Sequence, residues 1–363
     1  MATREKTIFS SMKKDVDAII LMNAVEPNLD SSFFYATGIP SGLFEGCLAI
    51  IEPRRTEVLV SELEALSAKE ARVKVSVFEN GEKRGKLMKK KLSRYRRIGV
   101  NSTELTHSNY ELLKRMKIPG SKLVDISKDL HSARMIKQPD ELSRIRKACS
   151  IASRACQAIP KFVREGVTET QAAADLACEM MGLGASGPGF ESVVAFGSKS
   201  AEPHYSPSVK RRLKPGNFAL FDFGAKYQRY VSDLTRTFVC GTASRKKKEM
   251  HSTVLEAQRA ALDEIADGVM GSVVDEAARR VIDGTKFEGL FIHSTGHGIG
   301  ISVHDPGSIS SVVDMELKEG MVLTVEPGVY IPKYGGVRIE DDILVTKKGC
   351  RVLTSCSKEL RAL

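Results

Sequence analysis

The strongest constraint on the fold is a pair of aspartates inside a long apolar segment. Phe218–Val239 reads FALFDFGAKYQRYVSDLTRTFV, in which Asp222 and Asp233 interrupt two runs with the alternating pattern of β-strands. If the two strands form a hairpin centred near Tyr227 and Gln228, the two carboxylates lie nearly opposite each other. Facing carboxylates repel, and burying them without a partner costs stability. The segment therefore predicts a positive group between Asp222 and Asp233.

Three more ionisable side chains recur in similar apolar sequence downstream. His297 lies in HSTGHGIG, Glu326 in TVEPGVY and Glu340 in VRIEDDILV. Together with the two aspartates they form a ligand set for two divalent cations, and such an oxygen-rich set suits Mn²⁺, Co²⁺, Zn²⁺ or Fe²⁺. A pair of cations also needs bridging carboxylates, which Asp and Glu provide. The alternative is a set of buried ion pairs in which Arg236 and Arg338 neutralise the carboxylates.

This order of residues resembles the pita-bread metallopeptidases, a family that includes methionine aminopeptidases, aminopeptidase P, prolidase and creatinase. Its metal ligands follow one another as Asp, Asp, His, Glu and Glu. The chain fills these positions in the same order with Asp222, Asp233, His297, Glu326 and Glu340. Two further histidines of the family pattern match His204 in SAEPHYSPS and His304 in GHGIGISVH. The resemblance covers about residues 140 to 363.

The resemblance implies a role for each ligand. Asp222 would chelate one metal ion, Asp233 and Glu340 would bridge both ions, and His297 and Glu326 would hold the other.

Other side chains would act on the substrate or support the ligands. The resemblance implies that Glu326 is the general base and later the proton donor, and that His204 and His304 contact the substrate carbonyl and the oxyanion. His293 is expected to be structural. The supporting residues that we expect are Arg338, Thr235 and Thr237 as partners of ligand carboxylates, and Tyr230 in the substrate pocket.

Two domains are expected along the chain. Over residues 1–135, apolar runs such as CLAIIEP, TEVLVS and VKVSVFE alternate with helical segments, which predicts an α/β domain. The break at Gln138-Pro139-Asp140 then starts a helix. Residues 136–363 predict an α+β domain, which the resemblance identifies as the pita-bread fold. In it RYVSDLTRTFV, MVLTVEPGVYI and GVRIEDDILVT each predict a strand. Its helices are expected at about 141–163, 168–182, 245–267 and 271–284.

The N-terminal domain separates the branches of the family. Most methionine aminopeptidases lack such a domain, whereas prolidase, aminopeptidase P and creatinase have one. Creatinase lacks the metal ligands, as do non-catalytic relatives that bind proteins or nucleic acid. The resemblance therefore implies a metallopeptidase that hydrolyses Xaa-Pro bonds with a water bridging two divalent metal ions, Mn²⁺ or Co²⁺ in preference to Zn²⁺ or Fe²⁺. The expected substrate is a small peptide with proline after the first residue.

The length of that peptide stays open. Prolidases that act on dipeptides often have an arginine shortly after the second histidine, but HDPGSISS has no basic residue from Asp305 to Ser311. The resemblance therefore implies either an Xaa-Pro dipeptidase or an Xaa-Pro aminopeptidase. Two alternatives remain: a non-catalytic pita-bread module that binds through a basic surface, and an aminopeptidase of other specificity, such as methionine aminopeptidase.

Composition sets limits on partners and compartment. The chain of 363 residues has no apolar run long enough for a signal peptide or a bilayer span, so we expect a cytoplasmic protein with no membrane partner. Its seven cysteines are dispersed without a CxxC pair, which argues against a disulfide framework. The net charge of +10 comes largely from residues 81–97. We interpret that stretch as the solvated face of a helix, so nucleic acid is not an expected partner. A homodimer is also expected.

Overall fold

The computed structural model describes residues 3–71, 73–116 and 122–363. The chain divides into two compact units, Met1–Arg134 and Met135–Leu363. No helix among the described residues has the length and apolar character needed to cross a membrane.

The first unit is built on one mixed sheet with the strand order β4-β3-β2-β1-β5-β6. Its centre, β1 (Ala18–Met22), is the fully buried run AIILM, which pairs antiparallel with β2 and parallel with β5. The other strands are β2 (Leu48–Glu52), β3 (Arg55–Ser61), β4 (Lys74–Phe78), β5 (Arg97–Val100) and β6 (Lys122–Asp125).

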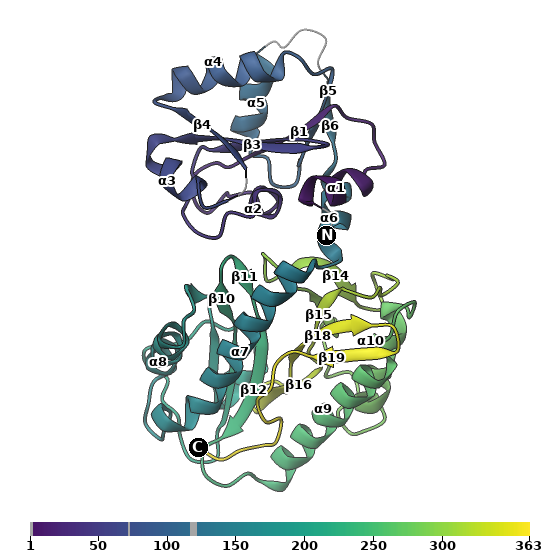
Figure 1. The fold of residues 1–363 in the computed structure, drawn as a ribbon. Helices are drawn as coiled ribbons and strands as arrows, with labels where there is room; N and C mark the ends of the chain where they lie inside the picture. Colours follow the sequence, from purple (N-terminus) through teal and green to yellow (C-terminus); the bar gives the residue numbers. More distant parts are fainter. Residues whose placement is uncertain (1–2, 72, 117–121) are drawn as a thin grey trace. The chain divides into compact units, whose positions relative to one another are not determined.

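Helices cover both faces of this sheet, with α4 and α5 on one face and α2 and α3 on the other (Figure 1). The basic stretch forms α4, which buries Met88 and Leu92 and points most of its lysines to solvent, as expected for a solvated helix face. The helices are α1 (Arg4–Ser10), α2 (Ser31–Thr37), α3 (Ala65–Ala68), α4 (Gly81–Leu92), α5 (His107–Arg115) and α6 (Ser127–Met135), with a 3₁₀ turn at Glu62–Glu64.

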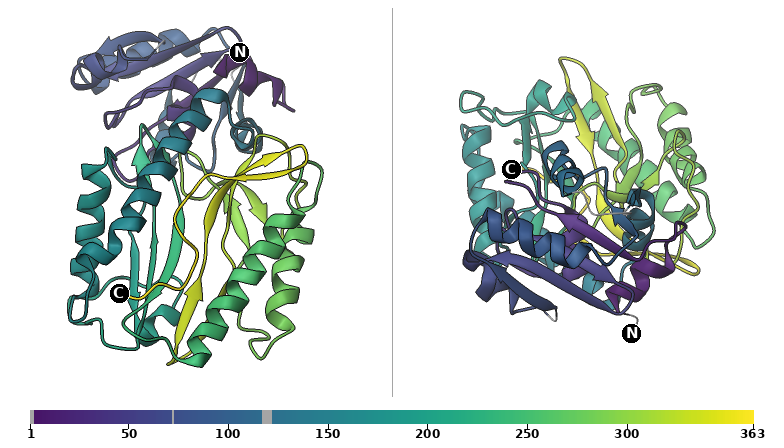
Figure 2. Two further views of the ribbon diagram at one scale, coloured as in Figure 1. Left: turned by 60° about the horizontal axis from the view of Figure 1, so that its bottom comes forward. Right: turned by 90° about the horizontal axis from the view of Figure 1, so that it is seen from above.

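The second unit places helices on either side of its strands (Figure 2). Helices α7 (Pro139–Phe162) and α8 (Glu169–Gly182) share one hydrophobic core with β8, β9 and β12. Helices α9 (Arg245–Glu264) and α10 (Gly271–Asp283) share another with β15, β17 and β18. Helix α7 begins with Pro139 at its first position and a capping box in which Glu141 accepts the Gln138 backbone N–H at 2.9 Å. All four helices lie where the sequence predicts them.

The strands of this unit form several small sheets. Their orders are β12-β9-β8, β11-β10-β7, β14-β13-β15-β18-β19 and β16-β17. The strands of the first two sheets are β7 (Gly187–Pro188), β8 (Val193–Phe196), β9 (Phe218–Phe223), β10 (Ala225–Tyr227), β11 (Tyr230–Val231) and β12 (Leu234–Val239), and a 3₁₀ helix spans Gly197–Ala201. The others are β13 (Gly296–Gly298), β14 (Asp305–Ile309), β15 (Val322–Val325), β16 (Gly328–Ile331), β17 (Gly335–Arg338), β18 (Asp341–Thr346) and β19 (Gly349–Val352).

The register of the aspartate hairpin differs from the prediction. Its turn is centred between Gln228 and Arg229, so Asp222 pairs with Thr235 and Asp233 lies two residues nearer the turn. Both turn residues have positive φ, 46° and 75°, as in the type I′ turns that suit the twist of hairpins. The prediction was wrong by one position because Gln-Arg is not a recognisable signature of such a turn.

Three predicted strands are each broken in two. RYVSDLTRTFV is interrupted at Ser232 and Asp233, MVLTVEPGVYI at Glu326 and Pro327, and GVRIEDDILVT just before Asp341. At each break the chain passes from one sheet to another. The apolar pattern continues through the breaks because both halves are buried, so the sequence alone did not reveal them.

Candidate metal centre

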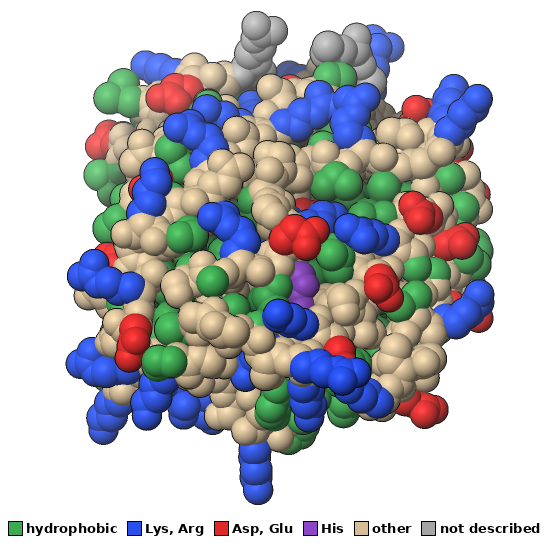
Figure 3. All heavy atoms as spheres, turned by 90° about the horizontal axis from the view of Figure 1, so that it is seen from below, with side chains coloured by type: hydrophobic (Ala, Val, Ile, Leu, Met, Phe, Trp, Pro, Cys, Tyr) green, Lys and Arg blue, Asp and Glu red, His purple; other side chains and the backbone are tan. Residues whose placement is uncertain are grey.

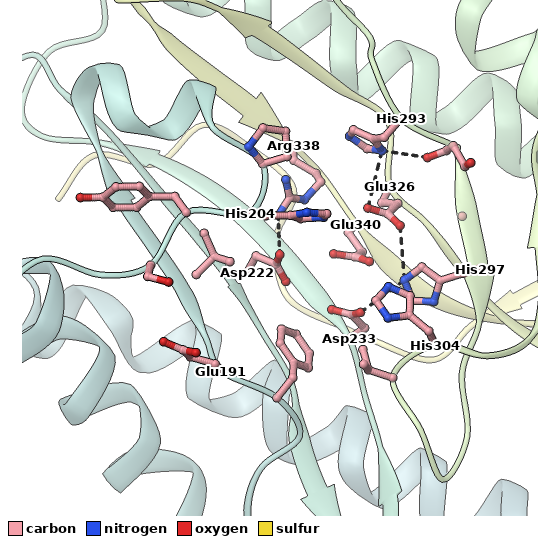
Figure 4. Close-up of a pocket in the computed structure, with 18 of the residues that line it drawn as sticks. Glu191, His204, Asp222, Asp233, His293, His297, His304, Glu326, Arg338 and Glu340 are labelled. Atoms are coloured by element: carbon pink, nitrogen blue, oxygen red, sulfur yellow. Dashed lines mark hydrogen bonds and ion pairs between the residues drawn. The ribbon is translucent and has the colours of Figure 1, made fainter. Parts of the chain in front are cut away.

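The ionisable residues of the second unit meet in a cavity of about 490 Å³. This volume is in the range of pockets that hold small ligands. The predicted site residues that line it are His204, Asp222, Asp233, His297, His304, Glu326, Arg338 and Glu340. Asp222, His297 and Arg338 lie on strands of different sheets, the others lie in connections between elements, and their side chains point toward one another (Figure 4).

The tightest group consists of Asp233, His297 and Glu340, whose potential ligand atoms all lie within 4.8 Å of one another. Asp233 and Glu340 occupy breaks between strands, and His297 lies on β13. Their backbones are fixed individually: Asp342 accepts the Asp233 N–H at 2.9 Å, and the Thr235 carbonyl accepts the Glu340 N–H at 3.2 Å. The strand breaks thus aim carboxylates into the cavity without leaving their backbone groups unpaired.

Glu326 completes this side of the cavity. It occupies the break between β15 and β16, where its backbone N–H donates to the Thr295 carbonyl at 2.8 Å. Its Oε1 lies 3.4 Å from the Nε2 atom of His297. Burial raises the pKa of Glu326 to about 8, with Asp222 adding to the shift and Arg338 opposing it.

His297 presents a lone pair to these carboxylates. Its Nδ1 bonds the Gly298 carbonyl at 3.1 Å, and because a carbonyl only accepts, the proton is on Nδ1. Burial lowers the pKa of His297 to about 4, so the ring is neutral. Its Nε2 therefore carries no proton of its own and faces Asp233 Oδ2 at 3.7 Å and Glu326 Oε1 at 3.4 Å. A cation between these atoms would be bound by all three.

Asp222 has a different partner. It lies on β9 and forms an ion pair with the guanidinium of Arg338, a buried side chain. Arg338 also donates to the Thr235 hydroxyl at 3.0 Å and to the Tyr330 hydroxyl at 2.9 Å. The alternative in which arginines neutralise the carboxylates therefore holds for one of them, because Arg338 pairs with Asp222. The other predicted arginine, Arg236, pairs with Asp341 at 2.7 Å, outside the ligand set.

The remaining carboxylates lie close together, and their combined negative charge exceeds the single positive charge of Arg338. Burial, followed by the charge of Glu340, raises the pKa of Asp233 well above its ordinary value. Burial, followed by the charges of Glu326 and Asp222, does the same for the pKa of Glu340. Asp233 Oδ1 is buried and has no hydrogen-bond partner among residues 3–71, 73–116 and 122–363. An anionic, oxygen-rich set with one imidazole and an unsatisfied buried oxygen fits divalent cations.

Comparisons with known proteins show the family to which the chain belongs. Residues 143–347 match the metallopeptidase family M24, and residues 8–136 match the creatinase/prolidase N-terminal domain. The chain belongs to metallopeptidase family M24. It is therefore an enzyme of a family that uses divalent metals, and its fold is the creatinase-type N-terminal domain followed by the pita-bread domain, as predicted.

Relatives of the M24 chain match it along its whole length. It is 37% identical over 363 residues to a protein named Xaa-Pro dipeptidase from Pyrococcus horikoshii, covering 99% of each chain. The structure of an X-Pro aminopeptidase from Thermotoga maritima has a TM-score of 0.90 at 31% identity, covering 96% of this chain and 98% of that one. The prolidase structure from Pyrococcus horikoshii has a TM-score of 0.88 at 34% identity, covering 98% and 99%.

The two predicted substrate histidines of the M24 chain both line the cavity. His204 follows the 3₁₀ helix Gly197–Ala201, and the His304 ring lies with its centroid 4.4 Å from that of His297. The pairing of β13 with β14 shifts register between His297 and Gly298. This irregularity bends the chain, so that two histidines seven residues apart reach one cavity.

The predicted supporting threonines differ in what they contact. The Thr235 hydroxyl donates to Glu340 Oε2 at 2.5 Å. Thr237 instead bonds the backbone of Arg338, accepting its N–H at 3.3 Å and donating to its carbonyl at 3.1 Å. Asp342, which the sequence analysis did not single out, accepts the Asp233 backbone N–H. The sequence feature that could have predicted Asp342 is its position two residues after Glu340, which places both on the same face of an alternating pattern.

One prediction about the pocket was wrong, and one further histidine lies in the cavity. Tyr230 does not line this cavity: it is 2% exposed, and its hydroxyl donates to Glu141 on α7 at 3.1 Å. It pairs with Tyr227 directly after the turn, which directs its ring to the core beneath α7. His293, expected to be structural, lines the cavity and bonds the Tyr330 hydroxyl at 2.8 Å. Its even spacing from His297 was the available signal.

Proposed function

We propose that this M24 enzyme hydrolyses the bond between the first residue and a following proline in small peptides. The observation that carries the proposal is the convergence of Asp233, His297 and Glu340 within 4.8 Å in a cavity open to a small ligand. Full-length similarity to proteins named for Xaa-Pro substrates supports the same specificity. The proposed metal ligands are Asp222, Asp233, His297, Glu326 and Glu340.

A proline substrate suits this kind of site. The Xaa-Pro bond is a tertiary amide whose nitrogen has no N–H. An enzyme therefore cannot bind the substrate through a hydrogen bond donated by that nitrogen. When bound, the divalent cations would supply Lewis-acid polarisation of the scissile carbonyl and a water of lowered pKa. The chain's own residues then handle the protons and the developing charge.

Glu326 is the proposed general base and later proton donor. Its Oε2 atom lies 3.9 Å from the Nδ1 atom of His293, and its Oε1 lies near His297. A carboxylate held beside the scissile bond can accept a proton from the attacking water and return it to the leaving proline nitrogen. His204 and His304 line the cavity as proposed hydrogen-bond donors to the substrate carbonyl and the oxyanion.

Finer features of the enzyme are proposed on separate grounds. Mn²⁺ or Co²⁺, in preference to Zn²⁺ or Fe²⁺, is supported by four carboxylates against one imidazole. A catalytic domain over residues 136–363 and a separate domain over 1–135 are supported by the concentration of the site in the second unit. A reducing, cytoplasmic compartment is supported by seven free cysteines. A homodimer is supported by Leu63 and Leu66, which are 91% and 78% exposed.

The non-catalytic alternative has less support. A binding module has no need to bury four carboxylates beside one another against their repulsion. On the face of the molecule in Figure 3, Lys and Arg side chains are spread over the surface with acidic side chains among them. The basic stretch itself lies on α4, which buries Met88 and Leu92 and turns most of its lysines to solvent, as an ordinary solvated helix face does.

A substrate panel tests the proposal. The protein is stripped of metal with a chelator, reloaded with Mn²⁺ or Co²⁺, and assayed on Ala-Pro, Ala-Pro-Ala and Met-Ala-Ser. We expect metal-dependent release of alanine from at least one proline substrate and no cleavage of Met-Ala-Ser. Cleavage of Met-Ala-Ser alone would assign a methionine aminopeptidase, and cleavage of none would favour the binding module. The ratio of Ala-Pro to Ala-Pro-Ala separates dipeptidase from aminopeptidase.

A further inference from the structure

A buried ion pair lies directly beside the loop that carries His304. Lys137 Nζ lies 2.7 Å from Asp305 Oδ2, and the two side chains are only 1% and 3% exposed. Lys137 immediately precedes the capped start of α7, and Asp305 immediately follows His304 and begins β14. The reaction proposed above uses neither residue.

Stability alone is a weak explanation for this pair. The free-energy cost of removing two charges from water is about as large as the gain from their mutual attraction. A buried ion pair can therefore often be replaced by apolar side chains without loss of stability. What such a pair does supply is a directional contact that fixes one arrangement of the groups that it joins. The question is therefore which segment this contact fixes.

The segment is the irregular stretch between β13 and β14. Residues 301–304 have no strand pairing. At its start the stretch is held by two backbone bonds, from the Ile299 N–H to the Val322 carbonyl at 3.1 Å and from the Val231 N–H to the Gly300 carbonyl at 2.9 Å. At its far end the backbone of Asp305 pairs with Gly298 across β13 and β14, and the charged contact with Lys137 holds the Asp305 side chain.

The two ends of this loop also meet each other. A Cβ on Gly300 would lie 2.4 Å from Asp305 Oδ2 and 3.0 Å from Lys137 Nζ, so only glycine lets the ion pair close over the loop. Lys137 is itself fixed, because its backbone N–H donates to the Gly320 carbonyl at 2.9 Å beside β15. A rigid lysine thus anchors the residue next to His304.

We propose that Lys137 is a positioning residue for the reaction, acting through Asp305 on His304. The ion pair fixes the loop so that the His304 ring stays in the cavity against the His297 ring, at the 4.4 Å centroid separation. The proposal rests on the proposed function, because it takes His304 to contact the substrate. It concerns the placement of a side chain and is independent of which metal the enzyme uses.

A double-mutant cycle with His304 tests this action. Lys137→Met is nearly isosteric and removes the charge, so kcat on the better proline substrate should fall by about 10- to 100-fold through misplacement of His304. Metal content should stay at the wild-type level. In a His304→Ala background the same substitution should cost nothing further in kcat, and Lys137→Arg should restore most of the rate.

A matched control separates this effect from general destabilisation. Lys358 Nζ also lies 2.7 Å from a buried aspartate, Asp341, elsewhere in the same unit. Lys358→Met should lower kcat by the same factor in the wild-type protein and in the His304→Ala variant. If Lys137→Met behaves like this control, or leaves kcat unchanged, the proposal is overturned. Should Lys137→Met not fold, Lys137→Met/Asp305→Leu removes both charges and enters the same cycle.

A measurement that needs no enzymatic turnover distinguishes the positioning role of Lys137 from the proposed peptidase activity. In protein labelled with ¹⁵N-histidine, the His304 ring signals are identified by their loss in His304→Ala. Lys137→Met should shift or broaden them and leave the signals of His251, which is buried on α9, in place. Unchanged His304 signals overturn the positioning role even if the enzyme is active. An inactive wild type with displaced His304 signals instead contradicts the proposed function alone.

Discussion

At the scale of single residues, the site stores electrostatic repulsion that a cation would relieve. Asp233 and Glu340 are 4% and 1% exposed, and both have raised pKa values because burial and neighbouring carboxylates disfavour their charged forms. His297 turns a lone pair toward the same oxygens. Arg338 offsets one of the four negative charges by pairing with Asp222, and the charge that remains is what the proposed cations would neutralise. Each residue is poorly placed for stability by itself and well placed as a ligand.

Substitution of Asp233 tests this reading. Asp233→Asn removes one charge from the crowded set while keeping its shape, so turnover should be lost and metal content should fall. The metal-free variant should melt at the same temperature as the metal-free wild type or higher, because one repulsion is gone. Calorimetry of the two metal-free proteins makes the comparison. A variant that melts far lower would identify the carboxylates as a structural ion-pair network.

The two neighbouring histidines should respond differently to alanine. His304→Ala should keep the metal content of the wild type and lower kcat by about 10²–10³-fold, the usual loss for one oxyanion donor. His297→Ala removes a proposed ligand, so metal content and rate should both fall. Elemental analysis of the two variants beside their kinetics decides between the roles. Loss of metal in His304→Ala and not in His297→Ala would reverse the assignment.

At the scale of elements, the strand breaks create the site. Asp233, Glu326 and Glu340 each lie where one strand ends and the next begins in a different sheet. A residue in a continuous strand shares its face with residues two positions away, but at a break the side chain is free of that alternation. The three carboxylates therefore reach one cavity from three separate sheet connections.

The same breaks explain how far the sequence could predict the molecule. The identity and order of the ligand residues are legible because charged residues stand out in apolar strand sequence. The register of the hairpin could not be predicted, because Gln228 and Arg229 form the turn without the usual asparagine or glycine. The place of Tyr230 then followed the wrong register. The place of His293 in the cavity wall was not predicted, because its hydrogen bond to Tyr330 joins residues 37 positions apart in the sequence.

The unusual turn makes a stability prediction. Gln228 adopts φ 46°, which asparagine tolerates better than glutamine does. Gln228→Asn should therefore raise the free energy of unfolding by about 0.5–1 kcal/mol. Gln228→Val should lower it, because β-branched residues resist positive φ. Urea unfolding of both variants gives the measurement, and kcat should not change. Equal stability of the two variants would contradict the turn geometry.

At the scale of the whole molecule, stability without metal should depend on pH through the buried acids. Burial is the largest cause that raises the pKa of Glu326 and that of Asp342 to about 8 each. The folded chain then binds protons more tightly than the unfolded chain between the ordinary carboxyl pKa, near 4, and about 8. Through these two acids, the metal-free protein loses stability as pH rises towards 8. Three buried histidines, His251, His293 and His297, have pKa values lowered to about 4 by burial and oppose this trend below about pH 6.5, so the trend is clearest between pH 6.5 and 8.

Melting temperatures at pH 6 and pH 8.5 check this sign. The metal-free wild type should melt lower at pH 8.5, and Glu326→Gln should show a smaller decline because one of the two acids is gone. Addition of Mn²⁺ should raise the melting temperature most at pH 8.5, where the carboxylates are ionised and bind the cation best. A metal-free protein that is more stable at pH 8.5 than at pH 6 would contradict the assignment.

The most direct test of the central claim is a metal titration of activity. Metal-free protein is titrated with Mn²⁺ while the initial rate of alanine release from Ala-Pro and Ala-Pro-Ala is measured. A two-metal Xaa-Pro peptidase predicts no release before metal is added and a rate that reaches its plateau at two equivalents per chain, with Asp233→Asn inactive throughout. Release that survives complete removal of metal, or loaded protein that leaves both peptides intact, would contradict it.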